Sequence, residues 1–150
     1  GLSATLASVT LASFYIFATL TKQAGTFSYI TLLFIACLLG YLWHNAAPSQ
    51  MLMGDAGSRA MGALIAVTAL QSGSPLLYLV FAVVLMIDGG IGLVKVALLR
   101  FLKIRILKKT RTPLHDHVRK VLGWSGMQTV FRFAIIQLVV SAAVLYYVSM

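Results

Sequence analysis

The chain has three carboxylate side chains, and the first of them lies in a setting that suits a metal ion. Asp55 stands between Gly54 and Gly57, and Ser58 follows just before a short apolar run. The glycines permit close backbone approach, and Ser58 can cap the helix that follows. A carboxylate beside a helix N-terminus can hold Mg²⁺, a cation usually shared with substrate phosphates. The alternative is a capping aspartate in a surface turn.

Asp88, the second carboxylate, interrupts a long apolar run. An ionisable group there costs about 2.5 to 3.5 kcal/mol on insertion scales and normally faces a protein interior or a wet cavity. Lys95 lies seven residues later, on about the same helical face, and can offset the charge. Three glycines at 89–92 permit a kink or a close helix contact. Structural pairing and a place in a site both remain open for Asp88.

Asp116, the third carboxylate, lies between His115 and His117 in a segment rich in lysine and arginine. These three side chains can bind a metal, but a His-x-His pair lacks the third and fourth ligands of a zinc site. Phosphate fits the basic surroundings better. The alternative is a juxtamembrane polybasic stretch that binds anionic lipid, at about 1 kcal/mol per charge.

The composition indicates that membrane helices position these residues. Of 150 residues, 60% are hydrophobic and 10% are charged, which leaves too few polar side chains to cover a surface in water. An ordinary soluble domain and a disordered chain are therefore excluded. The net charge of +9 would suggest nucleic acid in a soluble protein, but in a membrane protein it is typical of cytoplasmic loops. We therefore expect no nucleic-acid partner.

The apolar runs predict an all-α, polytopic membrane helix bundle with about five transmembrane helices. They cover residues 3–20, 29–43, 60–70, 75–99 and 130–148. The longer runs approach the roughly 20 residues that cross a hydrocarbon core of about 30 Å. We expect the fourth helix to be kinked near Asp88 to Gly92. No linker divides the chain, so residues 1–150 are predicted to form a single membrane domain.

The basic residues predict the orientation of the bundle. The segment 100–128 is dense in lysine and arginine, whereas the loops on the opposite side carry only Lys22. By the positive-inside rule, the loops at 45–59 and 100–128 and the N-terminus are cytoplasmic.

Two motifs in this order resemble those of the polyprenyl-phosphate N-acetylhexosamine-1-phosphate transferase superfamily. Asn45 and Pro48, followed by residues 53–58, are similar to the Asn-x-x-Pro and Met-Gly-Asp-x-Gly-Ser signature of that family, at the same spacing. Residues 113–117, then Gly-Trp at 123–124, resemble its Pro-Ile-His-His-His segment and the Gly-Trp after it. The resemblance covers essentially the whole chain and about half of a family member, the C-terminal half.

The resemblance implies half of a ten-helix, Mg²⁺-dependent enzyme of the bacterial cytoplasmic (inner) membrane. The most similar branch moves phospho-N-acetylmuramoyl-pentapeptide from a UDP-linked donor to undecaprenyl phosphate, in peptidoglycan precursor synthesis. Carried over by position, Asp55 is the catalytic Mg²⁺ ligand and Asn45 contacts the donor substrate. His115 and His117 belong to the loop that closes over the donor.

Two positions depart from the family pattern. Asp116 replaces the middle histidine of the donor loop, which reverses a charge or adds a metal ligand. Leu52 stands where an aromatic side chain is common, so it offers the uracil of the donor only an apolar contact. The paired aspartates of the family lie upstream and are absent here, so we expect this chain to be inactive alone.

Two other functions remain open. The first is a sister transferase that uses UDP-N-acetylglucosamine as donor. The second is a non-catalytic membrane module whose basic segment binds anionic lipid or a partner subunit. For the transferase we expect a UDP-linked sugar donor, undecaprenyl phosphate and membrane lipid as partners, with a homodimer as an open alternative.

Overall fold

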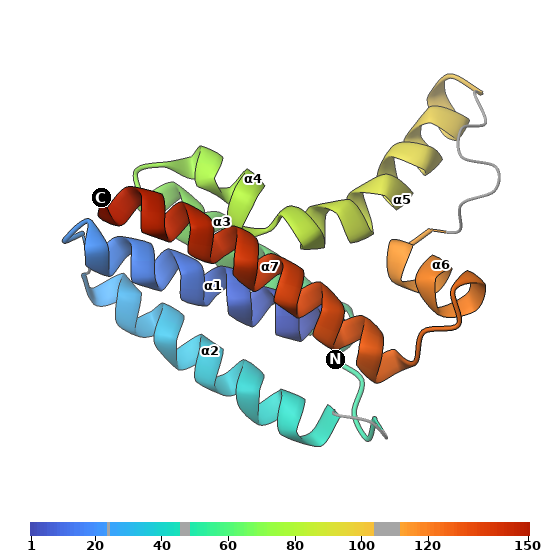
Figure 1. The fold of residues 1–150 in the computed structure, drawn as a ribbon, viewed down its shortest axis with the longest axis horizontal. Coiled ribbons are helices and arrows are strands. Elements are labelled where there is room, and N and C mark those ends of the chain that lie inside the picture. The colour runs from blue at the N-terminus through green and yellow to red at the C-terminus, as the bar shows by residue number, and fades with distance from the viewer. Residues whose placement is uncertain (24, 46–48, 104–111) are drawn as a thin grey trace.

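The computed structural model describes residues 1–23, 25–45, 49–103 and 112–150, and within these ranges every regular element is a helix. The all-α prediction is therefore confirmed. The elements are α1 (Leu2–Leu20), α2 (Thr26–Asn45), α3 (Gly54–Gln71), the 3₁₀ turn η1 (Pro75–Leu77), α4 (Tyr78–Phe81), α5 (Val83–Phe101), α6 (Leu114–Val121) and α7 (Gly126–Ser149) (Figure 1).

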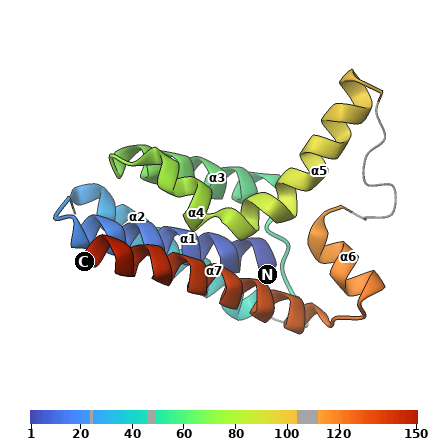
Figure 2. The ribbon, with the colours of Figure 1, turned by 45° about the horizontal axis from the view of Figure 1, so that its top comes forward.

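Helix α1 is the centre of the bundle, with α2, α3 and α7 packed against it (Figures 1 and 2). Half of the apolar stretch of α1 is buried, compared with 11% for α2 and 22% for α7. Both outer helices are apolar on their exposed faces as well, which is typical of helices that meet lipid rather than water. The sequence and the burial pattern together describe a multi-pass membrane protein.

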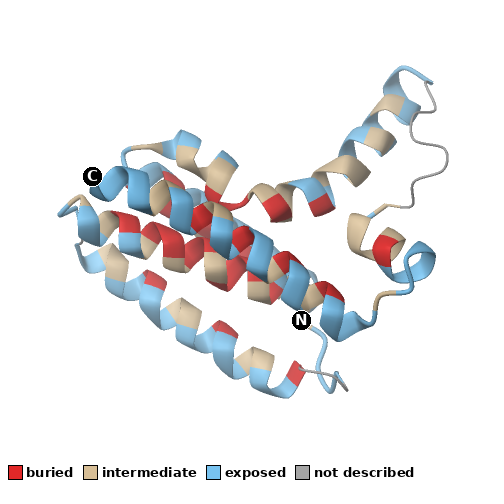
Figure 3. Cartoon of the chain, in the orientation of Figure 1, coloured by how far each residue is buried: buried red, intermediate tan, exposed pale blue. Residues whose placement is uncertain are grey.

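Three apolar clusters along α1 hold the bundle together, and Figure 3 shows the buried residues of this helix. Small residues of α1 let the neighbouring helices approach closely. The first cluster joins α1 to α2 and α3 through Ala4, Ala7, Leu11, Leu38, Met61 and Ile65. The second joins it to α5, α6 and α7 through Leu6, Val84, Val118 and Phe133. The third contains Phe14 and Phe81, whose rings meet edge to face at 5.1 Å.

Three of the described helices, α1, α2 and α7, are long and apolar enough to cross a membrane, and the bent pair of Pro75–Phe81 with α5 makes a fourth if it counts as one span. Helix α3 is not among them. It begins at Gly54 rather than near residue 60, so its first two turns include Asp55 and Arg59. A helix thus forms at each of the five expected places, but the third is less apolar than the others.

The fourth span is bent, but the predicted position of the kink near Asp88 to Gly92 is wrong. The segments Pro75–Phe81 and Val83–Phe101 meet at 87°, and α5 continues without a break through residues 88–92. Polar side chains from other helices explain why the bend lies between Phe81 and Val83. Thr10 Oγ1 donates to the Phe81 carbonyl at 2.7 Å, and Gln137 Oε1 accepts from the Val84 N–H at 2.9 Å. A broken helix in a membrane requires such partners for its freed backbone groups.

Beyond this bend, α5 points away from the bundle, and α6 packs against its first half and against the start of α7 (Figures 1 and 2). Helix α6 occupies part of the expected loop at 100–128. Pro113 precedes its first residue, and Gly123 follows it with φ +68°. That left-handed conformation suits glycine and is common just after the last turn of a helix. The expected loop is therefore helical in its second half.

Candidate functional site

The residues of the first motif lie at one end of the bundle, where α1 begins, α2 ends and α3 begins (Figure 1). A small cavity of about 120 Å³ marks the place where these three helices meet. Its lining includes Ser3 of α1, Tyr41 of α2 and Ser58 of α3, with Met53 just before α3. The helix packing thus places residues that are more than 50 positions apart in the sequence around one hollow.

Asp55 lies in the first turn of α3, with its side chain 92% exposed. Its Oδ2 is 3.6 Å from Nη2 of Arg59, one turn later, and that side chain is exposed as well. An exposed ion pair of this kind contributes little to stability, about 0 to 1 kcal/mol. The carboxylate is therefore open to a ligand, and the positive end of the helix dipole favours an anion at this place.

Ser58 does not cap α3 as the sequence suggested. The helix begins at Gly54, four residues earlier, and the Ser58 hydroxyl donates to the Asp55 carbonyl at 3.1 Å. Gly54 has φ +66°, a conformation that other residues rarely adopt. The glycine in front of Asp55 thus starts the helix, which brings the carboxylate onto its first turn.

Asn45 is the last residue of α2 and is only 6% exposed. With its amide oxygen accepting from the Tyr41 hydroxyl at 2.6 Å, its nitrogen donates to the Met51 carbonyl at 2.5 Å and to the Ser49 hydroxyl. These bonds tie the backbone at 49–51 to the end of α2. Leu52, which follows directly, is 95% exposed. Asn45 thus holds the segment that displays Leu52 and leads to Asp55.

Asp88 and His115 come together from α5 and α6. The His115 N–H donates to Asp88 Oδ1 at 2.7 Å, and the ring nitrogen Nδ1 lies 2.8 Å from Oδ2 and 3.1 Å from Oδ1. Asp88 is buried, with 8% of its surface exposed. The buried carboxylate therefore has a partner in the second motif, which sequence reasoning missed. Its position in an apolar run signals the need for a partner, but not which one.

Asp116 and His117 follow on the same helix. Asp116 Oδ1 forms an ion pair with Lys120 Nζ at 3.0 Å, one turn along α6, and His117 is half-buried. Val118 anchors the helix in the apolar cluster that contains Leu6. The predicted lipid-binding or phosphate-binding residues Lys108, Lys109 and Arg111 lie outside the described residues. The described part of the second motif is thus held to the bundle by the Asp88 contact and by apolar contacts of Leu114 and Val118.

The two motifs do not form one metal cluster. Within the described ranges, no three side chains of histidine, cysteine, aspartate or glutamate are placed to hold a metal ion together. A site with one carboxylate still suits Mg²⁺, which keeps several waters and takes its other ligands from substrate phosphates. The exposed oxygens of Asp55 at a helix N-terminus fit that role.

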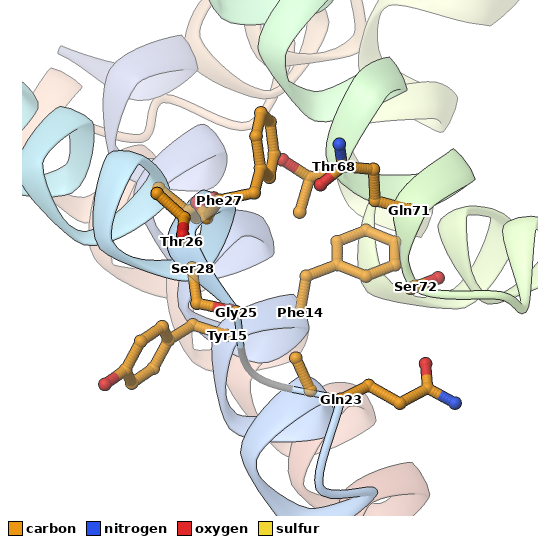
Figure 4. A pocket seen from close by; sticks show the side chains of 12 residues that line it. Phe14, Tyr15, Gln23, Gly25, Thr26, Phe27, Ser28, Thr68, Gln71 and Ser72 are labelled. Atoms are coloured by element: carbon orange, nitrogen blue, oxygen red, sulfur yellow. Dashed lines mark hydrogen bonds between the residues drawn. The ribbon is translucent and has the colours of Figure 1, made fainter.

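A larger cavity, of about 270 Å³, lies at the opposite end of the bundle between α1, the start of α2 and the end of α3. Figure 4 shows side chains with hydroxyl and amide groups around it, among them Thr26, Ser28, Thr68 and Gln71. None of these residues belongs to either motif. Because both motifs lie at the other end, this cavity is not part of the candidate site.

Comparison with known proteins gives consistent matches. Residues 1–73 match the family described as glycosyl transferase family 4. The chain is 54% identical over 100 residues to a phospho-N-acetylmuramoyl-pentapeptide-transferase from Treponema pallidum. These residues are 67% of this chain and 28% of that protein. An alignment of 153 positions, gaps included, covers 93% of this chain and 43% of the protein of that name from Borreliella afzelii, with 35% identity. For Borrelia turicatae the identity is 39%, over 71% of this chain and 30% of the relative.

The chain therefore spans less than half the length of these curated relatives. The alignment with the Borreliella protein covers nearly the whole chain, so it spans the positions of both motifs. The predicted resemblance is thus confirmed: the chain belongs to glycosyl transferase family 4, as a partial relative of the phospho-N-acetylmuramoyl-pentapeptide-transferases.

Proposed function

We propose that the chain is part of a membrane transferase that moves phospho-N-acetylmuramoyl-pentapeptide from a UDP-linked donor to undecaprenyl phosphate. The observation that carries the proposal is the open Asp55 carboxylate at the start of α3, within a chain whose curated relatives bear the name of this enzyme. The loops at 45–59 and 100–128 would face the cytoplasm of the bacterium, where a nucleotide-linked donor is found.

The reaction consists of attack by one phosphate on a diphosphate. An oxygen of undecaprenyl phosphate forms a bond to the sugar-linked phosphorus of the donor, the bond from that phosphorus to the bridging oxygen breaks, and UMP leaves. All reacting groups are anions, so the enzyme mainly positions them and neutralises their charge. Bound Mg²⁺ would supply that neutralisation, and Asp55 would hold it through its exposed oxygens.

We propose that the remaining predicted site residues contact the donor from two parts of the fold. Asn45 maintains the segment 49–51, and Leu52 would lie against the uracil of the donor. His115 and His117 on α6 would contact the donor from the other side, with Asp116 between them. We further propose that activity requires the parts of the relatives that this chain does not cover, since it matches only 28% to 43% of their length.

The test is transfer of radiolabelled donor to undecaprenyl phosphate by the complete natural polypeptide in membranes, compared with its Asp55→Asn variant. Loss of one metal-bound carboxylate oxygen should lower kcat about 100-fold or more, since metal stabilisation of the transition state contributes several kcal/mol. Asp55 is exposed, so the variant should fold normally.

Arg59→Gln is the matched control for this test. It breaks the same ion pair but leaves the Asp55 carboxylate in place. If Asp55 acted only through that pair, both variants would lose the same activity. Equal activity of Asp55→Asn and the unchanged protein would exclude the metal-ligand role. Absence of transfer by the unchanged protein would instead favour the non-catalytic module that binds anionic lipid.

A further inference from the structure

The contact between Asp88 and His115 joins the fourth span to the donor loop. Asp88 lies in the first half of α5, and His115 is the second residue of α6, 27 positions later. The two contact each other through both the backbone and the ring of the histidine. The carboxylate thus fixes two things at once, the start of α6 and the orientation of the imidazole.

The geometry determines which ring nitrogen carries the proton. A carboxylate only accepts hydrogen bonds, so Nδ1, at 2.8 Å from Oδ2, must be the donor. In the neutral ring the proton is then on Nδ1, and Nε2 keeps its lone pair. In the charged ring Nδ1 still donates to Asp88. In either state, Nε2 is the ring atom left for a ligand.

Asp88 is more buried than His115, as expected where a buried carboxylate orients a more exposed imidazole. The Asp88 side chain is 12% exposed, whereas that of His115 is 35% exposed. A buried carboxylate is costly unless its hydrogen bonds are satisfied, and here the partners are the N–H and the ring of one residue. The exposed part of the pair is the histidine, the residue in the motif.

We infer that Asp88 is a positioning residue for His115: its carboxylate holds the ring proton on Nδ1 and so presents Nε2 to the diphosphate donor. This inference rests on the proposed function for the identity of the donor. Second partners of this kind fix the tautomer and the direction of a functional histidine, and their loss commonly costs about 10- to 100-fold in activity.

Asp88→Asn tests the inference because it separates the two roles of the carboxylate. The amide oxygen can stay in the place of Oδ1 and accept from the His115 N–H, which keeps the start of α6 docked. The amide nitrogen then takes the place of Oδ2, 2.8 Å from Nδ1, and donates to it. An amide nitrogen cannot accept from Nδ1, so we expect the ring to move its proton to Nε2, the change that lowers kcat about 10⁴-fold in the corresponding asparagine variant of a serine protease triad.

The readout is the ¹⁵N signal of the imidazole in the complete natural polypeptide, labelled with [¹⁵N]histidine at about pH 8.5, where an ordinary imidazole is neutral. His115→Gln identifies the His115 signals among those of all the histidines of that polypeptide. We expect a protonated Nδ1 in the unchanged protein and a protonated Nε2 in Asp88→Asn. We also expect kcat to fall about 10- to 100-fold, with the KM for undecaprenyl phosphate unchanged.

Gly89→Ala is the matched control, since it alters the next residue of α5 at a place where an added Cβ has open space. It should change neither the ring signals nor kcat. A protonated Nε2 in the unchanged protein would overturn the inference, and so would an unchanged tautomer in Asp88→Asn. Full transfer activity of Asp88→Asn with a switched tautomer would also overturn it. Absence of transfer by the unchanged protein would instead contradict the proposed function, while the ring signals would still decide the role of Asp88.

Discussion

At the residue scale, Asp55 and Asp88 show how one functional group takes two roles from its surroundings. The Asp55 side chain is 92% exposed beside an arginine, and the Asp88 side chain is 12% exposed beside a histidine. The first is open to a cation that arrives with its own ligands. Both oxygens of the second lie within hydrogen-bond distance of His115, so we infer that Asp88 influences a substrate through that histidine.

Leu52 gives a prediction at the same scale. It is 95% exposed, so Leu52→Ser should leave the free energy of unfolding within about 0.5 kcal/mol of its present value. If the leucine covers the uracil of the donor, the same change should remove about 1.4 kcal/mol of apolar contact and raise the KM for the donor about tenfold. Steady-state kinetics with varied donor concentration measure this effect. An unchanged KM would remove Leu52 from the donor site.

The motifs could be predicted from the sequence, but the partner of Asp88 could not. A pairing between two residues seven positions apart on one helix, such as Asp88 and Lys95, can be predicted from helical periodicity alone. The pairing with His115 depends on how the chain between α5 and α6 returns, and no local pattern encodes that path. Asn45 likewise matched a motif, but only the structure shows that its amide supports the segment 49–51.

At the scale of elements, the bend between α4 and α5 is a feature that local sequence patterns do not predict. Apolar runs predict the helices because each span must bury its backbone and present apolar side chains. The break at Ala82 has no glycine or proline to announce it, while the glycines at 89–92 stay helical. The break is possible because Thr10 of α1 and Gln137 of α7 satisfy its backbone groups. Its cause lies 50 or more residues away in the sequence.

Gln137→Leu should therefore destabilise the bundle. Gln137 is fully buried, accepts from the Val84 N–H at 2.9 Å and donates to the Val80 carbonyl at 3.1 Å. Leucine has a similar volume but leaves both backbone groups unsatisfied, at a cost of about 1 to 3 kcal/mol each. The melting temperature in detergent, followed by far-UV circular dichroism, should fall by roughly 5 to 20 °C.

Gln71→Leu makes the same chemical change at an exposed position on α3, and it should leave the melting temperature nearly unchanged. Equal melting temperatures for Gln137→Leu and the unchanged protein would mean that the bend does not depend on Gln137.

At the scale of the whole molecule, the bundle has two ends with different chemistry. One end carries the start of α1, the end of α2 and the start of α3, with Asp55 and Asn45 (Figure 1). The other carries the end of α1, the start of α2, the turn at 72–74 and the C-terminus. This arrangement agrees with the two sides that the basic residues predict, and the side of the membrane at which each end lies remains a prediction.

Cysteine labelling can test that orientation because the chain has a single cysteine, Cys37, which can be replaced by alanine. Gln23 and Gln50 are both exposed and lie at opposite ends of the bundle, so Gln23→Cys and Gln50→Cys are matched probes. In intact spheroplasts, a membrane-impermeant maleimide should label Gln23→Cys and not Gln50→Cys. After the membranes are opened, both should react, which shows that each thiol is accessible.

A third probe, Val121→Cys, reports the side of the membrane on which α6 and the second motif lie. Val121 is the last residue of α6 and is 58% exposed. The proposed function requires α6 and Asp55 to meet one nucleotide-linked donor, so the two must lie on the same side of the membrane. Val121→Cys should therefore be protected in spheroplasts and labelled in opened membranes, as Gln50→Cys is. Labelling of Val121→Cys from outside, with Gln50→Cys protected, would place the motifs on opposite sides and exclude a shared donor site.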